Sequence, residues 1–217
     1  MVNKTKGENM MYVLMSILIG YVFGCIHGSQ LVGKYKKIDI KKSGVKNAGA
    51  SNTTILLGWK YGILVALIDI FKGTLAVLLM LYILNEQGIS GDAQILLVYI
   101  TALAVIVGHN FPVTMKFSGG KGTASLVGIL LAIDWKIALL GIGILLIFTF
   151  ATDYLVIGVL MMYISFLVTT YYFYGIEPTM IVVFLSLLSV VKHLENYKRI
   201  ISKEEKKLSS MFQKKTK

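Results

Sequence analysis

Cysteine and proline are both scarce in this 217-residue chain, which contains one cysteine and two prolines. The single cysteine, Cys25, cannot form a disulfide within the chain and argues against cysteine ligation of a metal. We interpret it as a small buried hydrophobic residue. No Pro/Ser-rich or low-complexity stretch divides the chain, so we expect no second folded soluble domain.

Charged residues are also few, at 15% of the chain, whereas 56% of the residues are hydrophobic. Soluble domains average roughly 45–50% apolar residues. The composition therefore predicts an all-α polytopic integral membrane protein, with residues 1–217 forming one domain. Residues 10–192 are expected to be membrane-embedded and residues 193–217 to form a basic tail.

The first apolar run resembles a signal peptide in its position but not in its ending. No small-residue cleavage site of the A-x-A kind follows it, and the polar stretch FGCIHGSQ does not provide one. We expect this segment to be retained.

Seven apolar windows are candidates for membrane-spanning helices, several of them shorter than the roughly 20 residues that a perpendicular crossing needs. The fourth and fifth could instead be one helix interrupted at Asp134–Lys136. The windows are Met11–Val32, Tyr61–Leu84, Ile95–Val107, Thr123–Ile133, Ile137–Phe150, Tyr154–Tyr174 and Thr179–Val191.

The positive charge is concentrated in three segments. Residues 33–60 carry seven lysines against one aspartate, residues 108–122 carry two lysines, and the segment from Lys192 carries nine Lys/Arg against three Glu. By the positive-inside rule all three lie in the cytoplasm. About seven crossings satisfy this rule, with the N-terminus outside and the tail cytoplasmic, whereas six would leave the tail outside. The net charge of +11 thus reflects topology and predicts no nucleic-acid partner.

Residues 108–122, GHNFPVTMKFSGGKG, place polar groups and glycines between apolar windows. Glycine-rich backbone allows N–H groups to approach an anion closely, and a glycine loop that opens a helix directs the positive end of the helix dipole at it. The segment therefore predicts an anion site at a membrane edge. It is not a Walker A loop, because Thr123 follows Gly122 rather than Lys121.

Three further polar patterns accompany this loop. The stretch SGVKNAGASN, residues 43–52, suits either a capped loop or a polar ligand site. Asp69 and Lys72 share a helix face inside the second window. They form either a structural ion pair or part of a polar cavity. His193, Asn196 and Arg199 share a face of the last helix, where lipid anchoring is the simpler interpretation. The three histidines lack metal-ligand spacing, and we predict no metal.

Taken in order, NAGASN, the D-x-x-K-G of residues 69–73, GHNFPVTMKFSGGKG and H-x-x-N-x-x-R resemble the bacterial acyl-phosphate:glycerol-3-phosphate acyltransferase family, the PlsY type. The resemblance runs from about Gly24 to Glu205. It implies transfer of a fatty acyl group from acyl phosphate to sn-glycerol 3-phosphate, giving 1-acyl-glycerol 3-phosphate and phosphate, at the cytoplasmic face of the bacterial cell membrane. It also implies membrane lipids and the acyl-phosphate-producing acyltransferase as partners, and no cofactor.

The resemblance also implies roles for individual residues. The glycine loop, residues 119–122, binds phosphate, His193 or a substrate phosphate oxygen is the base, and Asp69 and His109 order the loops. The expected catalytic residues are His193, Lys121 and Asn196; the expected substrate- and phosphate-binding residues are Asn47, Gly49, Asn52, Asp69, Lys72, His109, Gly119, Gly120, Gly122, Arg199 and Glu205.

Several positions depart from the family pattern. Val45 replaces a serine, Lys46 a glycine, and Ile55 an arginine; His27 stands at the proline of the first-span motif. A valine cannot donate a hydroxyl hydrogen bond and an isoleucine cannot clamp a phosphate. The alternative is therefore a weakly active or inactive paralogue that binds acyl phosphate or the enzyme that makes it. A transporter is a third alternative, although no inverted repeat is apparent.

Overall fold

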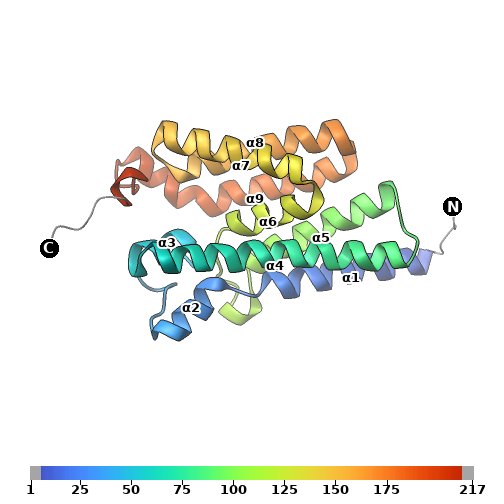
Figure 1. The fold of residues 1–217 in the computed structure, drawn as a ribbon, viewed down its shortest axis with the longest axis horizontal. Coiled ribbons are helices and arrows are strands. Elements are labelled where there is room, and N and C mark those ends of the chain that lie inside the picture. Colours follow the sequence, from blue (N-terminus) through green and yellow to red (C-terminus); the bar gives the residue numbers. More distant parts are fainter. Residues whose placement is uncertain (1–5, 212–217) are drawn as a thin grey trace. The chain divides into compact units, whose positions relative to one another are not determined.

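The structure is a computed structural model that describes residues 6–211, and all regular secondary structure in that range is helical. The helices are α1 (Lys6–Gly24), α2 (Gly28–Lys36), α3 (Ala50–Leu57), α4 (Trp59–Glu86), α5 (Asp92–Asn110), α6 (Thr123–Ile133), α7 (Trp135–Thr152), α8 (Leu155–Tyr174) and α9 (Ile176–Ile201), with short 3₁₀ turns η1 (Val113–Met115) and η2 (Ser209–Met211) (Figure 1). The predicted all-α membrane fold is confirmed.

Six of the described segments are long and apolar enough to cross a membrane. Their helices expose large apolar side chains, such as Leu18, Phe71 and Leu187, which is the pattern that lipid contact requires. The six segments are Met10–Lys36, Trp59–Glu86, Asp92–Met115, Trp135–Thr152, Leu155–Tyr174 and Ile176–Ile201.

The fourth predicted window is the exception, because α6 has only 11 residues. At 1.5 Å per residue it extends about 17 Å, roughly half of the hydrocarbon core. Asp134 has extended backbone angles and ends α6 before α7 begins at Trp135. The two windows are therefore separate helices, and the count of seven crossings stays a prediction.

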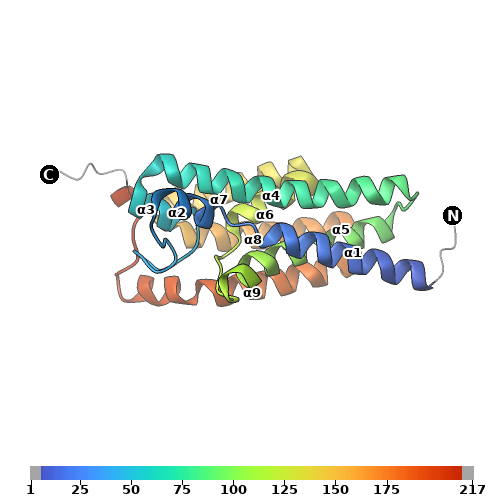
Figure 2. The same ribbon diagram turned by 90° about the horizontal axis from the view of Figure 1, so that it is seen from below.

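The chain divides into two compact units, Met1–Asp134 and Trp135–Lys217. In the first unit, α1, α4 and α5 lie side by side, with α6 packed on α4 and α5 and with α2 and α3 at one end (Figures 1 and 2). In the second unit, α8 packs against both α7 and α9. The prediction of one domain over residues 1–217 stays a prediction.

Helix contacts in the first unit depend on glycine. A β-carbon at Gly24 would meet the backbone carbonyl of Val105, and one at Gly108 would meet that of Tyr21, so α1 and α5 touch through their backbones. Small residues permit this approach between membrane helices, where van der Waals packing and hydrogen bonds hold the helices together.

Two hydrogen bonds show which segments lie at each end of the first unit. Tyr12 Oη of α1 donates to Gln87 Oε1, just after α4, across 3.3 Å. At the opposite end Lys41 Nζ donates to the Gly119 carbonyl across 3.3 Å. The two basic loops, 33–60 and 108–122, therefore meet at the same end of this unit, as the charge pattern predicted for these two.

Candidate active site

A buried charge cluster lies beneath the glycine loop in the first unit. Lys72 Nζ is 3.0 Å from Asp69 Oδ1 and 2.7 Å from His109 Nδ1, and all three side chains are almost fully buried. Lys72 also donates to the carbonyls of Gly24, at 3.1 Å, and Ile26, at 2.5 Å. A buried ammonium needs this number of acceptors to offset its desolvation.

His109 connects the cluster to the glycine loop. Its carbonyl accepts a hydrogen bond from the Gly120 N–H at 3.1 Å, and the preceding Gly119 N–H donates to the Asn110 carbonyl at 3.1 Å. Nδ1 of His109 faces Lys72, so in the neutral ring the proton is on Nε2, which lies beside Gly120. Ser125 Oγ of α6 lies 3.4 Å from the same Nδ1.

Glycine at positions 119 and 120 is required by packing. A β-carbon at Gly119 would meet the His109 carbonyl oxygen and His27 Nε2, and one at Gly120 would meet His109 Nε2 and the Ala48 carbonyl. Gly122 has φ 84°, a left-handed angle that suits glycine, and is the residue before α6. The loop therefore opens at the N-terminus of α6, where the first N–H groups lack intrahelical partners.

Lys121 lies half-buried in this loop between Gly120 and Gly122. Its ammonium belongs to the same short segment as the N-terminus of α6, so a cation and a helix dipole act on one region. This arrangement favours a phosphate group.

Asn52 holds together the loop that precedes α3. Its Nδ2 lies 2.8 Å from the Ile40 carbonyl, 2.9 Å from that of Ser43 and 2.9 Å from that of Asn47, while its Oδ1 accepts from the Val45 N–H at 3.0 Å. The side chain is fully buried. These contacts give Asn52 a structural task in positioning Asn47 and Gly49, and its predicted role as a ligand stays a prediction.

Asn47 and Gly49 lie against the glycine loop, because the Ala48 carbonyl between them faces Gly120. Gly49 is the residue before α3 and has extended backbone angles. The first unit thus brings together the predicted site residues Asn47, Gly49, Asn52, Asp69, Lys72, His109, Gly119, Gly120, Lys121 and Gly122.

The second unit contains the remaining predicted residues, on α9 and the chain that follows it. Glu205 accepts from Arg199 Nε at 2.6 Å and from Asn196 Nδ2 at 2.6 Å. The N–H groups of Glu204 and Glu205 both donate to the Arg199 carbonyl, at 2.7 and 3.0 Å. The chain therefore turns back on the end of α9, and Asn196, Arg199 and Glu205 form one group.

His193 lies one turn before Asn196 and is 5% exposed. Its Nδ1 is 2.8 Å from the Ser189 carbonyl oxygen. A carbonyl oxygen only accepts, so Nδ1 carries the proton and the neutral ring has its lone pair on Nε2. That tautomer is the one a general base needs.

Comparison with known proteins identifies the family. The family model described as glycerol-3-phosphate acyltransferase matches residues 14–203. The chain belongs to the glycerol-3-phosphate acyltransferase family. The match extends across the boundary between the two compact units, which falls between Asp134 and Trp135 in the sequence.

Relatives and solved structures agree with this membership. The acyltransferase is 68% identical to glycerol-3-phosphate acyltransferase 1 of Oceanobacillus iheyensis over 94% of this chain and 99% of the relative. It is 33% identical to glycerol-3-phosphate acyltransferase of Thermoanaerobacter pseudethanolicus, over 91% and 96%.

Two crystal structures of PlsY (YgiH), an integral membrane glycerol 3-phosphate acyltransferase, share the fold. The glycerol 3-phosphate form has a TM-score of 0.81 at 28% identity, and the lysophosphatidic acid form 0.79 at 27%. Each alignment covers 93% of this acyltransferase and 99% of the solved chain.

Sequence reasoning missed three residues that shape the acyltransferase's glycine loop. His27 stacks on His109 with ring centroids 4.6 Å apart, and its Nε2 lies 2.9 Å from the His109 carbonyl oxygen. Lys41 contacts the Gly119 carbonyl, and Ser125 approaches the His109 ring. His27 stands where the family pattern has a proline, and this departure was the signal in the sequence that could have identified it. No sequence pattern indicated Lys41 or Ser125.

Proposed function

We propose that this protein is an active acyl-phosphate-dependent glycerol-3-phosphate acyltransferase. It transfers a fatty acyl group from acyl phosphate to the 1-hydroxyl of sn-glycerol 3-phosphate. The observation that carries the proposal is the glycine loop fixed to the buried Asp69–Lys72–His109 cluster, within a family match over residues 14–203.

The chemistry needs no covalent enzyme intermediate. The glycerol hydroxyl oxygen attacks the acyl carbon, the bond from that carbon to the phosphate oxygen breaks, and phosphate leaves with the bonding electrons. The hydroxyl proton passes to His193 Nε2 or to a substrate phosphate oxygen. An acyl phosphate is a mixed anhydride with a good leaving group, so positioning and charge neutralisation are the main tasks.

Each group of residues has a place in this proposal. Lys121, Gly122 and the first N–H groups of α6 bind phosphate, with Asn47, Gly49 and Lys72 beside them. Gly119 and Gly120, whose own N–H groups donate to the Asn110 and His109 carbonyls, shape the loop. His193, Asn196, Arg199 and Glu205 serve the second centre, where the proposed tautomer of His193 supports its role as a base. Both units would then act as one domain over residues 1–217, as the family match across their boundary supports.

The membrane setting follows from the charge distribution. We place the basic loops 33–60 and 108–122 and the tail 193–217 on the cytoplasmic side of the bacterial plasma membrane, by the positive-inside rule. Acyl phosphate is amphiphilic and can reach the site along the membrane surface. The acyltransferase that produces acyl phosphate is the partner we expect on that side.

The test uses purified full-length protein in lipid vesicles with acyl phosphate and glycerol 3-phosphate. We expect lysophosphatidate to form, and Lys121→Ala to reduce its rate by about 100-fold, the usual effect of losing one charge-stabilising group. Product formation no greater than that of Lys121→Ala would refute the proposal. Ligand-dependent stabilisation without turnover would instead support the alternative of an inactive paralogue. The replacements Val45 and Ile55 are the reason for considering that alternative.

A further inference from the structure

A second positively charged site lies beside the glycine loop, in a cavity of about 980 Å³ in the first unit. Its walls come from α2, from the loop that follows α2, and from the segment around η1. None of the residues Gly119–Gly122 lines it, although Ser118 does. The proposed acyl transfer gives this cavity no task.

Five lysines line the cavity against one acidic residue. Asp39 is paired with Lys42 at 3.5 Å, and both side chains are exposed. Among the described side chains of residues 10–210, Lys34, Lys46 and Lys116 form no ion pair that would neutralise them. Several lysines in the wall of one concave surface raise the local positive potential, which attracts phosphate.

Two of these lysines have backbone angles that disfavour any side chain. Lys46 has φ 54° and Lys116 has φ 51°, both in the left-handed region. A glycine would adopt these angles without strain, and glycine is the residue that the family pattern has at position 46. The chain therefore accepts backbone strain at two of the five positions where a lysine lines the cavity, which points to a function for these two ammonium groups.

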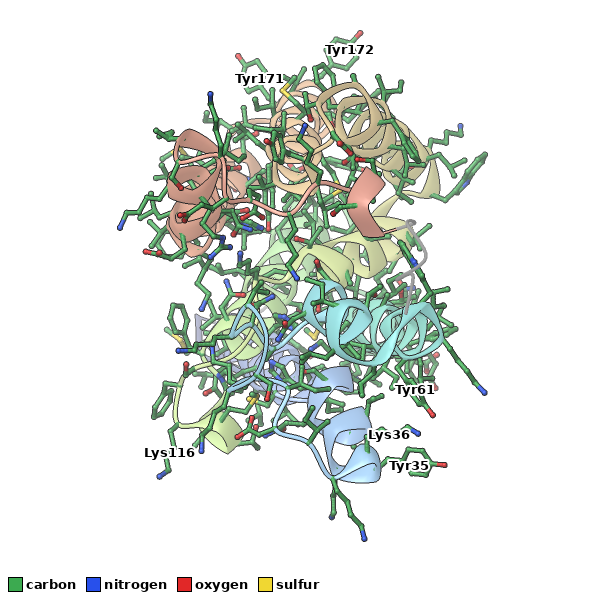
Figure 3. The ribbon with its side chains drawn as sticks, turned by 90° about the vertical axis from the view of Figure 1, so that its left-hand side faces the viewer. Tyr35, Lys36, Tyr61, Lys116, Tyr171 and Tyr172 are labelled. Carbon is green, nitrogen blue, oxygen red and sulfur yellow. The ribbon has the colours of Figure 1, made fainter. Side chains whose placement is uncertain are left out.

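The surroundings of the cavity are apolar and exposed. Tyr35, next to Lys34, is 75% exposed, and Phe117, next to Lys116, is 61% exposed. Figure 3 shows Tyr35 and Lys116 both extending outward from the first unit. Lysines that alternate with exposed aromatic residues at the end of membrane helices are typical of the interface, where a ligand presents a charged group and an apolar chain together.

We propose that this cavity binds the phosphate head group of an anionic membrane phospholipid, at a site separate from the glycine loop. The lysines bind the phosphodiester, and the acyl chains lie along the exposed apolar side chains of the neighbouring helices. Lys41 connects the two sites, because its Nζ is also 3.3 Å from the Gly119 carbonyl oxygen. Burial lowers the pKa of the Lys41 ammonium, and a lipid phosphate nearby would oppose that shift.

The experiment titrates full-length protein in neutral detergent with phosphatidylglycerol or phosphatidylcholine, and counts retained lipids by native mass spectrometry. The test variant is Lys34→Gln/Lys46→Gln/Lys116→Gln, which leaves Lys41 in contact with the glycine loop. Its matched control, Lys36→Gln/Lys37→Gln/Lys60→Gln, removes the same charge from lysines that do not line the cavity. Lys36 packs instead 4.5 Å from the centroid of the Tyr61 ring (Figure 3).

We expect wild type and control to bind phosphatidylglycerol in preference to phosphatidylcholine. We expect the test variant to bind it about 100-fold more weakly, from about fivefold for each lysine at a membrane surface. The single variant Lys46→Gly relieves the backbone strain, so it should fold at least as well as wild type and bind about fivefold more weakly.

Three outcomes would overturn the proposal. The test variant could bind phosphatidylglycerol as well as wild type, or the control could lose as much affinity as the test variant. Millimolar inorganic phosphate or glycerol 3-phosphate could also displace the lipid, which would make the cavity a site for a soluble phosphate. None of these measurements needs turnover, so a failure of the proposed acyl transfer would be distinguishable from a failure of this site.

Discussion

Lys72 Nζ lies 2.7 Å from His109 Nδ1, and these two side chains connect an ion pair inside the membrane segment to the backbone of the glycine loop. Asp69 holds Lys72 from one side, and the His109 ring and carbonyl both contact Gly120 on the other. The charge inside α4 therefore has a positioning task. It fixes the position of Gly120 and therefore of Lys121, the next residue.

Removing one partner of this buried pair should destabilise the protein strongly. Lys72→Met leaves Asp69 buried without its counter-charge, and we expect the free energy of unfolding to fall by about 3–5 kcal/mol. The double variant Asp69→Asn/Lys72→Met should lose less, because no isolated charge remains. Denaturation in detergent measures both, with Lys60→Met, on an exposed lysine, as the control. A double variant less stable than Lys72→Met would contradict this account.

A methyl group at position 120 should reduce activity without removing a polar group. In Gly120→Ala the new β-carbon meets His109 Nε2 and the Ala48 carbonyl, so the loop must shift. Displacement of a site by about 1 Å can cost about 100-fold in rate, and we expect kcat/KM to fall by about that factor. Gly143→Ala in α7, where a β-carbon meets nothing within 4 Å, is the matched control and should retain activity. Equal activity of the two variants would show that the loop tolerates the shift.

Asn52 offers a comparison between a replacement of the same shape, aspartate, and a truncation, alanine. Asn52→Asp places a carboxylate oxygen where Nδ2 now faces the carbonyls of Ile40, Ser43 and Asn47, so four acceptors would face one another. Asn52→Ala leaves the same carbonyls unsatisfied but adds no repulsion. We expect the aspartate to be the more damaging, by about 1–3 kcal/mol in the free energy of unfolding. Protease sensitivity of residues 37–49 measures the same loss locally, and an aspartate variant as stable as the alanine variant would be the contrary result.

The apolar windows predicted the long helices and α6, but not the short helix α3 or the break between α1 and α2. The window Thr123–Ile133 matches α6 because Gly122 and Asp134 interrupt the helix on either side. Gly58, with φ 87°, separates α3 from α4 in a stretch where no span was predicted. Helix ends of this kind depend on a few neighbouring residues, which a sequence displays directly.

Contacts between distant segments were much harder to predict. His27 and His109 stack across 82 residues, and Lys41 reaches Gly119 across 78 residues. No periodicity within either segment encodes such a pairing, which exists only after α1 and α5 have packed. Asn52 shows a related limit, since the pattern NAGASN suits a ligand site and a structural loop equally. The four hydrogen bonds of its amide group, which the fold alone reveals, show that it holds the loop together.

His193 should respond to substitution according to which group is the base. With Nδ1 committed to the Ser189 carbonyl, His193→Gln removes the lone pair on Nε2 and should lower kcat by about 10²–10⁴-fold with little change in KM. If a substrate phosphate oxygen takes the proton, the loss should be less than about tenfold. Steady-state kinetics in vesicles separates the two, and Ser189→Ala, which keeps the backbone carbonyl, should behave as wild type.

The segment after α9 is attached to the loop between α7 and α8 through one carboxylate. Asp153 Oδ2 accepts from the Ser209 hydroxyl at 2.6 Å, and Oδ1 accepts from the Ser209 N–H at 2.7 Å. The Asp153 carbonyl also accepts from the Leu208 N–H at 2.9 Å. The Ser209 hydroxyl and then its amide hold the pKa of Asp153 below its ordinary value of about 3.9.

A carboxyl with a lowered pKa stabilises the folded arrangement above its ordinary pKa, and the contribution disappears as the pH falls through the lowered value. Amide exchange at Ser209, corrected for its intrinsic pH dependence, should therefore be constant from pH 8 to pH 5 and accelerate only below about pH 4. Asp153→Asn imitates the neutral acid and should exchange faster even at pH 7, whereas Glu177→Gln, on an exposed residue at the start of α9, should not. Acceleration already present at pH 6 in the wild type would mean that another group holds this segment.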